Sequence, residues 1–234
     1  MLKNLLNLKA ISLDIDDTLW DYEVGFKRGI SAALSKLIEL DPLSANMTNE
    51  KHFVEIREQY NLSISEDSPN RWNYSVRRYE TFCKILETIN RPNAKIAKEM
   101  SICFSAGRYS NNDLFLDVIP SIQELRKTFK VGIISNGDTY PENLGLENLM
   151  DFAIYAPDEK IEKPDKKIFI KAANAAGCDL NQLLHIGDNE IADVAGAVDA
   201  GCMAAWINRF DRKPSFKTKP HFSIRDLSEL SQII

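Results

Sequence analysis

The chain has 234 residues, of which 44% are hydrophobic and 27% are charged, and it carries a formal net charge of -5. A chain of this size forms one or two domains with a substantial core, and its acidic balance excludes the basic footprint of a nucleic-acid-binding protein. No apolar run approaches the length of a bilayer span, and the first ten residues are too short and too interrupted for a signal peptide. We therefore expect a cytoplasmic protein with neither nucleic acid nor membrane as a partner.

The first strong element is an apolar strand at residues 8–14, which we expect to be buried on both faces, as in a parallel sheet. The hydrophobic pattern then becomes helical, and no strand is predicted before residue 113. Prolines and polar residues divide this region into four predicted helices, at 24–40, 49–60, 71–89 and 93–108. The sequence thus indicates a helical block inserted after the first strand.

Beyond Asp113 the pattern alternates between strand and helix. The predicted strands lie at 130–134, 152–155, 182–186, 203–207 and 221–224. The predicted helices lie at 120–129, 142–149, 165–176 and 190–200, with a last one from Asp226. This alternation is typical of an α/β fold with a doubly wound parallel sheet. We therefore predict an α/β core domain made of residues 1–19 and 113–234, and an all-helical domain of residues 20–112.

Polar side chains follow several of the predicted strands. Asp14 and Asp16 end the first strand two residues apart, so alternation puts both carboxylates on one face, where they repel unless a cation or a shared proton compensates. The other polar groups at or after strand ends are Ser135, Asn136, Lys163, Asp188 and, one helical turn further on, Asp193. Parallel sheets bind ligands at the carboxyl ends of their strands, so we expect all of these groups to converge there.

This set of side chains suits phosphate chemistry. Carboxylate oxygens in this number favour a hard cation, above all Mg²⁺. A hydroxyl, backbone N–H groups and a lysine can hold the oxygens of a phosphate. One aspartate would attack phosphorus, and a second would protonate the leaving oxygen and then activate water.

Each residue also has a plainer interpretation. Asp16 and Asp17 could cap a following helix, and Asp188 and Asp193 could be acids favoured near a helix N-terminus. Ser135 could be a turn residue, and Lys163 a solvated lysine in a charged stretch. The arginines and lysines at 209–219 are interpreted as solvated, and His185 as a core histidine.

Four segments in this order, DIDDTL, IISNG, EKPD and IGDNEIADVAGA, resemble the four motifs of the haloacid dehalogenase-like hydrolase superfamily. The resemblance covers nearly the whole chain and implies that Asp14 is the nucleophile and Asp16 the general acid and base. It implies a phosphate-binding set of Thr18, which shapes the loop, Ser135, Asn136 and Lys163. It also implies that Mg²⁺ is held by the Asp14 carboxylate, the Asp16 carbonyl and Asp188, with Asp193 supporting these ligands from behind.

The helical block resembles the helical cap of that superfamily, which closes over the site and reads the leaving group. The segments NGDTYPENLGLENLMDF, HIGDN, GCMAAWI and PHFSIRDLSEL resemble a bacterial branch acting on flavin mononucleotide and on a phosphorylated ribityl-aminopyrimidine. Trp20, Tyr22 and Arg71 are our candidates for substrate contacts, because an aromatic ring there could stack on a flat base. The alternative is that such aromatic residues form the core of the helical block.

We therefore expect a Mg²⁺-dependent phosphatase of small phosphorylated metabolites, either monomeric or homodimeric. Nucleoside monophosphates and sugar phosphates are alternative substrates. A haloacid dehalogenase would use the same first aspartate but would need neither Mg²⁺ nor the acid at Asp16, and a phosphoglucomutase-type transferase usually has glycine in place of Asp17. A non-catalytic phospho-receiver or binding module would need neither the helical insertion nor Asp16.

Overall fold

The computed structural model describes residues 7–44, 46–111 and 113–233. By its internal contacts the chain divides into two compact units. The first unit consists of Met1–Asp21 together with Leu114–Ile234, and the second of Tyr22–Asp113. Among the described residues, no helix combines the length and the apolar character that crossing a membrane requires.

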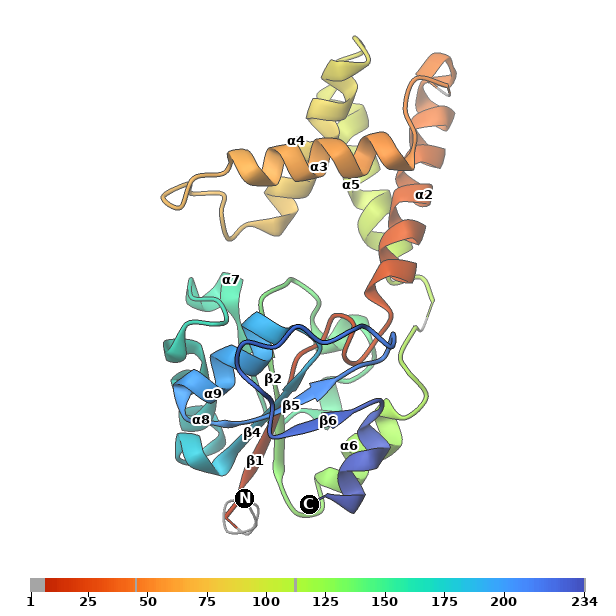
Figure 1. The fold of residues 1–234 in the computed structure, drawn as a ribbon. Coiled ribbons are helices and arrows are strands. Elements are labelled where there is room, and N and C mark those ends of the chain that lie inside the picture. Colours follow the sequence, from red (N-terminus) through yellow and green to blue (C-terminus); the bar gives the residue numbers. More distant parts are fainter. Residues whose placement is uncertain (1–6, 45, 112, 234) are drawn as a thin grey trace. The chain divides into compact units, whose positions relative to one another are not determined.

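The first unit is built on a six-stranded sheet in which every pair of neighbouring strands is parallel, in the order β3-β2-β1-β4-β5-β6 (Figure 1). The strands are β1 (Ala10–Leu13), β2 (Lys130–Ser135), β3 (Phe152–Tyr155), β4 (Leu183–Gly187), β5 (Met203–Ile207) and β6 (Phe222–Ile224). All residues of β1, β4 and β5 are buried, as expected for strands covered on both faces. The predicted doubly wound α/β fold is confirmed.

Helices cover both faces of this sheet (Figure 1). The α6 helix (Val118–Leu125) and the C-terminal 3₁₀ helix η6 (Leu227–Gln232) pack on one face, and α8 (Lys166–Ala176) and α9 (Gly196–Ala200) on the other. The α8 helix shows why these segments are helical, since its buried residues recur on one side: Ile168, Phe169, Ala172 and Ala173. Asp165 caps its start, and Gly177, at φ +72°, ends it.

Short connections differ most from the sequence-based expectation. The predicted helix at 142–149 is two single 3₁₀ turns, η2 (Pro141–Asn143) and η3 (Glu147–Leu149). The remaining short elements are α7 (Ala156–Glu159) and η4 (Leu180–Gln182). The predicted helix at 190–200 begins as a π-helix, η5 (Glu190–Ala195), and becomes the α-helix α9 at Gly196. A π-helix is rare and is frequently found at functional sites.

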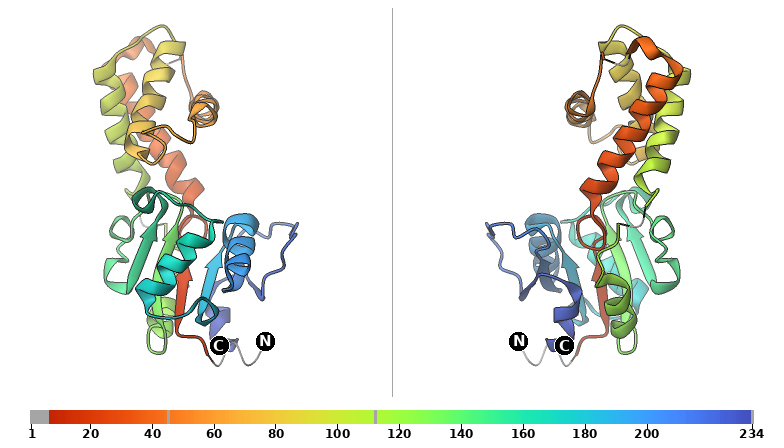
Figure 2. Two further views of the ribbon diagram at one scale, coloured as in Figure 1. Left: turned by 90° about the vertical axis from the view of Figure 1, so that its left-hand side faces the viewer. Right: turned by 90° about the vertical axis from the view of Figure 1, so that its right-hand side faces the viewer.

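The described residues of the second unit form four helices and the 3₁₀ turn η1 (Pro42–Ser44), so the predicted helical insertion is confirmed (Figure 2). The helices are α2 (Tyr22–Leu40), α3 (Glu50–Ser63), α4 (Tyr74–Thr88) and α5 (Ala94–Arg108). Asparagine side chains cap the starts of α3, α4 and α5. One phenylalanine from each helix meets in the core, with ring centroids 5.2 to 6.1 Å apart in the contacting pairs: Phe26, Phe53, Phe82 and Phe104.

Candidate active site

A pocket of about 240 Å³ lies within the first unit at the carboxyl ends of β1, β2 and β4. It brings together seven of the residues predicted from sequence: Asp14, Asp16, Ser135, Asn136, Lys163, Asp188 and Asp193. Four further residues that we had not predicted also line it: Asp17, Gly137, Asn189 and Ala192. Convergence at this edge follows from the parallel sheet, because all the strand ends meet there.

Lys163 joins two of the carboxylates. Its ammonium group donates to Oδ1 of Asp14 at 2.5 Å, to Oδ1 of Asp193 at 2.6 Å and to the carbonyl oxygen of Ile134 at 2.9 Å. The side chain of Lys163 is only 2% exposed, so it is not the solvated lysine that its charged neighbours in sequence suggest. A buried cation between two buried anions satisfies charges that would otherwise be costly to withdraw from water.

The charges of this cluster shift one another's pKa values. Burial raises the pKa of Asp14 well above its usual range, because the opposing attraction of Lys163 is weakened by repulsion from Asp193 and Asp188. Burial alone would lower the pKa of Lys163, but Asp14 and Asp193 outweigh it and raise that pKa, so the lysine stays protonated. Burial also opposes ionisation of Asp193, yet Lys163 and His185 hold the pKa of Asp193 well below its usual range.

His185 lies beneath the pocket and holds Asp193 from the other side. Its Nε2 is 3.0 Å from Oδ1 of Asp193, and its Nδ1 is 2.9 Å from the hydroxyl of Ser12. Burial lowers the pKa of His185, which favours the neutral ring. Because a carboxylate can only accept, Nε2 is the donor in the pair with Asp193. The interpretation of His185 as a core histidine is right, although this histidine also orients a carboxylate of the pocket.

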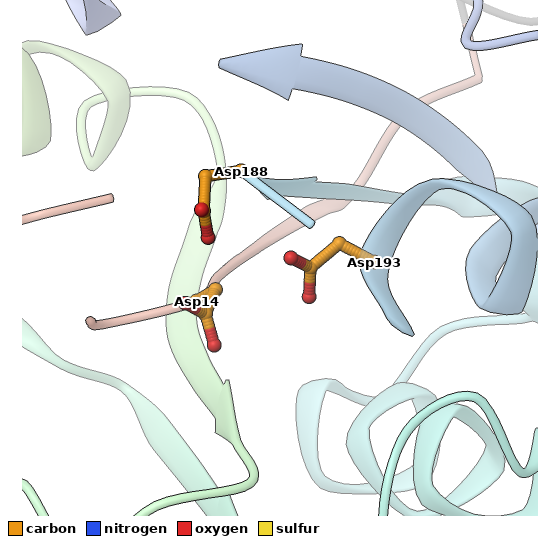
Figure 3. Close-up of side chains that lie close together, drawn as sticks. All are labelled: Asp14, Asp188 and Asp193. Carbon is orange, nitrogen blue, oxygen red and sulfur yellow. The ribbon is translucent and has the colours of Figure 1, made fainter. Parts of the chain in front are cut away.

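Asp188 completes a cluster of three carboxylates that lie close together (Figure 3). One oxygen of each of Asp14, Asp188 and Asp193 lies within 4.8 Å of the others. Burial and then repulsion from Asp193 raise the pKa of Asp188 to about 6. Hard oxygen donors at this spacing are compatible with a divalent cation.

Asp193 differs from its two neighbours in how its oxygens are used. Its Oδ1 accepts from Lys163 and His185, and its Oδ2 accepts from the backbone N–H of Asn189 at 2.9 Å. Both oxygens are thus engaged by the protein, which suits a supporting role better than direct ligation. The side chain of Asp193 lies directly against Gly187, where a Cβ would be only 2.2 Å from Cγ of Asp193. Glycine at position 187 therefore leaves the room that this carboxylate occupies.

Asp16 is oriented by two donors. The indole N–H of Trp20 donates to Oδ1 at 2.8 Å, and the hydroxyl of Thr139 lies 2.7 Å from the same oxygen. Gly137 faces the other oxygen, since a Cβ at Gly137 would lie 3.0 Å from Oδ2 of Asp16. The helix that follows this loop, α2, begins only at Tyr22, so neither Asp16 nor Asp17 caps it.

The β2 strand supplies Ser135 and Asn136. Ser135 is almost fully buried, and its Oγ accepts from the backbone N–H of Gly137 at 3.1 Å. The side-chain amide of Asn136 donates to the carbonyl of Lys163 at 2.9 Å and accepts from the N–H of Lys163 at 2.7 Å. Asn136 therefore fixes the loop that delivers the lysine.

The remaining sequence-predicted residues lie outside this pocket. Thr18 is fully buried and does not line it, which suits its expected part in shaping the loop, and its place in the phosphate-binding set stays a prediction. Trp20 is also fully buried beside Asp16, so its ring is not open to stack on a substrate. Tyr22 belongs to the second unit, where it stacks on Phe26 with centroids 5.6 Å apart.

Arg71 also belongs to the second unit, where its guanidinium lies 4.9 Å from the ring centroid of Trp72. Thr139 and Arg212 are site residues that sequence reasoning missed. Arg212 donates to Oδ2 of Asp188 at 2.6 Å and to Oδ2 of Asp17 at 3.1 Å, which corrects its interpretation as a solvated arginine. Neither residue stands next to a motif aspartate in sequence, so no local signal marks them.

Comparison with known proteins agrees with this geometry. A family model for haloacid dehalogenase-like hydrolases matches residues 8–201, so the chain belongs to that family. It is 24% identical to the 5-amino-6-(5-phospho-D-ribitylamino)uracil phosphatase YigB of Escherichia coli, over 97% of this chain and 96% of that protein. It is also 24% identical to the glyceraldehyde 3-phosphate phosphatase of Methanopyrus kandleri, over 86% of this chain and 84% of that one.

A solved structure also matches along the whole chain. It is that of a 2-haloacid dehalogenase from Pseudomonas syringae pv. tomato, with a TM-score of 0.79 and 30% identity, covering 97% of both chains. The chain thus resembles, in sequence, proteins named as phosphatases and, in fold, a protein named as a dehalogenase.

Proposed function

We propose that the chain is a phosphatase that hydrolyses phosphate monoesters of small metabolites through a phosphorylated aspartate. The observation that carries this proposal is the juxtaposition of two carboxylates in different settings at the end of β1. Asp14 is buried against the ammonium of Lys163, and Asp16 is oriented by two donors on a single oxygen. Such a pair suits a nucleophile and an acid–base group.

Asp14 is the nucleophile in this proposal. One of its oxygens attacks phosphorus, the bond from phosphorus to the ester oxygen breaks, and an acyl phosphate forms on Asp14. The attraction of Lys163 favours the ionised form of Asp14, against the effect of burial, and offsets the repulsion between the carboxylate and the incoming phosphate. Ser135 and the backbone at Asn136 would hold the phosphate oxygens, since both line the pocket beside Asp14.

Asp16 is the general acid and base in this proposal. The indole N–H of Trp20 can only donate, so Oδ1 of Asp16 is an acceptor, and we assign the exchanged proton to Oδ2. Oδ2 gives this proton to the leaving alkoxide. In the second half of the reaction Oδ2 takes a proton from the water that attacks the phosphorus of the acyl phosphate, which releases inorganic phosphate and restores Asp14.

We further propose that the acidic cluster holds Mg²⁺. Asp14 and Asp188 would hold it together with the backbone carbonyl of Asp16, and Asp193 would support them. Their hard oxygen donors fit this ion. When bound, Mg²⁺ supplies positive charge that offsets the negative charge of phosphate and carboxylate.

For the substrate we propose flavin mononucleotide or a phosphorylated ribityl-aminopyrimidine, with nucleoside monophosphates and sugar phosphates as the next candidates. The similarity to YigB along nearly the full length of both chains supports the phosphorylated ribityl-aminopyrimidine. We propose that residues 20–112 act as the cap domain that selects the leaving group, with Tyr22 and Arg71 among its contacts. The insertion of this segment directly after the Asp14–Thr18 loop supports the assignment.

Dehalogenation is the second candidate, because the solved structure with 30% identity is named a 2-haloacid dehalogenase. A halide leaves as a stable anion and needs no proton, so the two donors that orient Asp16 would then have no chemical purpose. The Asp188 carboxylate would have no cation to hold either. The site of this chain therefore favours the phosphatase.

The test is release of phosphate from a panel of phosphorylated metabolites, and of halide from 2-haloacids, with Mg²⁺ and with EDTA. We expect phosphate release that requires Mg²⁺ and is lost in Asp14→Asn, and no halide release. Asp158→Asn, a change of a carboxylate that does not line the pocket, serves as the matched control and keeps activity. Halide release, or phosphate release that survives Asp14→Asn, would overturn the proposal.

A further inference from the structure

Arg212 connects two carboxylates of the pocket from a loop that the proposed mechanism does not use. Its guanidinium bridges Oδ2 of Asp188, at 2.6 Å, and Oδ2 of Asp17, at 3.1 Å. Nη1 donates to Asp188 and Nη2 donates to Asp17, so each carboxylate binds a different nitrogen of the planar guanidinium. The bridge links the end of β4 to the loop that follows β1.

The backbone of Arg212 is held in place by one residue. Asn208 donates from its side chain to the carbonyl oxygen of Arg212 at 3.0 Å and accepts from the N–H of Arg212 at 2.8 Å. The guanidinium also lies 5.1 Å from the ring centroid of Phe210. These contacts fix the conformation of the loop around Arg212.

The same loop is anchored again further along the chain. The backbone N–H and the hydroxyl of Ser215 both donate to the carboxylate of Glu190, at 2.9 to 3.0 Å. Phe216 packs edge-on against Trp206, whose indole N–H donates to the carbonyl oxygen of Asp188 at 2.8 Å. The loop is therefore tied to the backbone of Asp188 as well as to its side chain.

We propose that Arg212 is a positioning residue that acts as the resident counter-ion of Asp188 and Asp17 and competes with the divalent cation for Asp188. This inference rests on the metal site of the proposed function. Asp188 is largely buried beside Asp193, and Arg212 supplies compensating charge at its outer oxygen. A divalent cation at Asp188 repels a guanidinium at this distance, so loading the metal releases Arg212 from Asp188.

This pairing makes the affinity of the site for metal weaker than its carboxylates alone would allow. Removing the guanidinium removes both the competitor and its repulsion of the bound cation. Because Arg212 is 47% exposed, solvent screens this effect, and we expect a change of about tenfold in metal affinity. The same exposure makes the substitution compatible with folding.

The experiment measures binding of Mn²⁺ to the full chain, from the electron paramagnetic resonance signal of free Mn²⁺, without substrate. The variants are Arg212→Met and Arg212→Lys, and the matched control is Arg225→Met, which removes an exposed arginine with one long ion pair to Asp211. We expect Arg212→Met to bind Mn²⁺ about tenfold more tightly than the wild type and Arg225→Met to match the wild type. Arg212→Lys should lie between, because lysine keeps the charge but lacks the fork.

A second readout is the thermal midpoint with and without Mn²⁺. Without metal, Arg212→Met should melt below the wild type, because two neighbouring carboxylates lose their cation, and saturating Mn²⁺ should abolish the difference. Equal or weaker Mn²⁺ binding by Arg212→Met would overturn the inference while leaving the metal site intact. If neither protein binds Mn²⁺ at millimolar concentration, both the inference and the proposed metal site are wrong.

Discussion

The ammonium of Lys163 lies 2.5 Å from Oδ1 of Asp14, and the two side chains are only 2% and 12% exposed. The same ammonium also contacts Asp193, so Lys163 is the cation on which both buried carboxylates depend. The lysine and the aspartates come from separate segments, and the fold holds them together in the low-dielectric interior.

Replacing Lys163 should therefore affect both stability and activity. We expect Lys163→Met to lower the free energy of unfolding without metal by about 3 kcal/mol, because it leaves two buried carboxylates without a cation. Turnover should fall at least about a hundredfold, because the phosphate then approaches an uncompensated carboxylate. Urea unfolding and phosphate release measure the two effects.

Lys167→Met is the matched control, since Lys167 is exposed on α8. This variant should change the free energy of unfolding by no more than about 0.5 kcal/mol and should leave turnover unchanged. A Lys163→Met protein as stable and as active as the wild type would contradict the role given to this lysine.

Thr139 is predicted to affect catalysis through Asp16. Thr139→Val keeps the shape of the side chain and removes the hydroxyl that lies 2.7 Å from Oδ1 of Asp16. We expect kcat for an alkyl phosphate to fall about tenfold, corresponding to about 1.4 kcal/mol, because Asp16 loses one of its two orienting donors. KM should change little, since Thr139 does not line the pocket.

An aryl phosphate with a good leaving group separates this effect from general damage. Such a leaving group needs less protonation by a general acid, so Thr139→Val should slow the first step less with this substrate. Thr128→Val, at an exposed position, should leave both rates unchanged. An equal loss on both substrates would argue against an acid–base role for Asp16.

Much of the fold and site follows from local patterns. The β3 and β5 strands were predicted to the residue, because each is an apolar run of strand length. The motif residues at strand ends were brought together as predicted, because topology alone makes parallel strands end at a common edge.

The contacts that sequence reasoning missed depend on tertiary structure. Thr139 reaches Asp16 across 123 positions and Arg212 reaches Asp188 across 24, and no periodic pattern marks either residue. Trp20 shows a different limit, because an aromatic side chain after a catalytic loop is compatible with a ligand contact or with burial. Its indole N–H donates to Asp16, four residues earlier, and its ring is buried in the core.

The helical unit is predicted to depend on its aromatic core. Phe53 is 1% exposed and packs against three other phenylalanine rings. Phe53→Ala should destabilise this unit by about 3 to 5 kcal/mol, through lost burial and the cavity that remains. Phe53→Leu, which keeps most of the volume, should cost less than about half as much. Urea unfolding followed by far-UV circular dichroism measures both, and equal effects of the two variants would contradict this packing.

Acid stability is predicted to depend in part on Asp151. Burial alone would raise the pKa of Asp151, but the N–H of Val131 and the guanidinium of Arg126 outweigh it and hold that pKa below its usual value. A pKa that is lower in the folded chain stabilises it above the ordinary value and loses this contribution as the pH falls through the folded value. Asp151→Asn should therefore flatten the fall of the melting temperature between about pH 5 and pH 3. The same dependence of melting temperature on pH in Asp151→Asn and in the wild type would contradict this role of Asp151.

In the proposed mechanism, Asp14 is the residue that carries the phosphoryl group. Borohydride reduction during turnover converts an aspartyl phosphate to homoserine, and peptide mass spectrometry then locates the converted residue. We predict homoserine at position 14, formed only in the presence of both substrate and Mg²⁺. Homoserine at another aspartate, or continued phosphate release with position 14 unmodified, would contradict the mechanism.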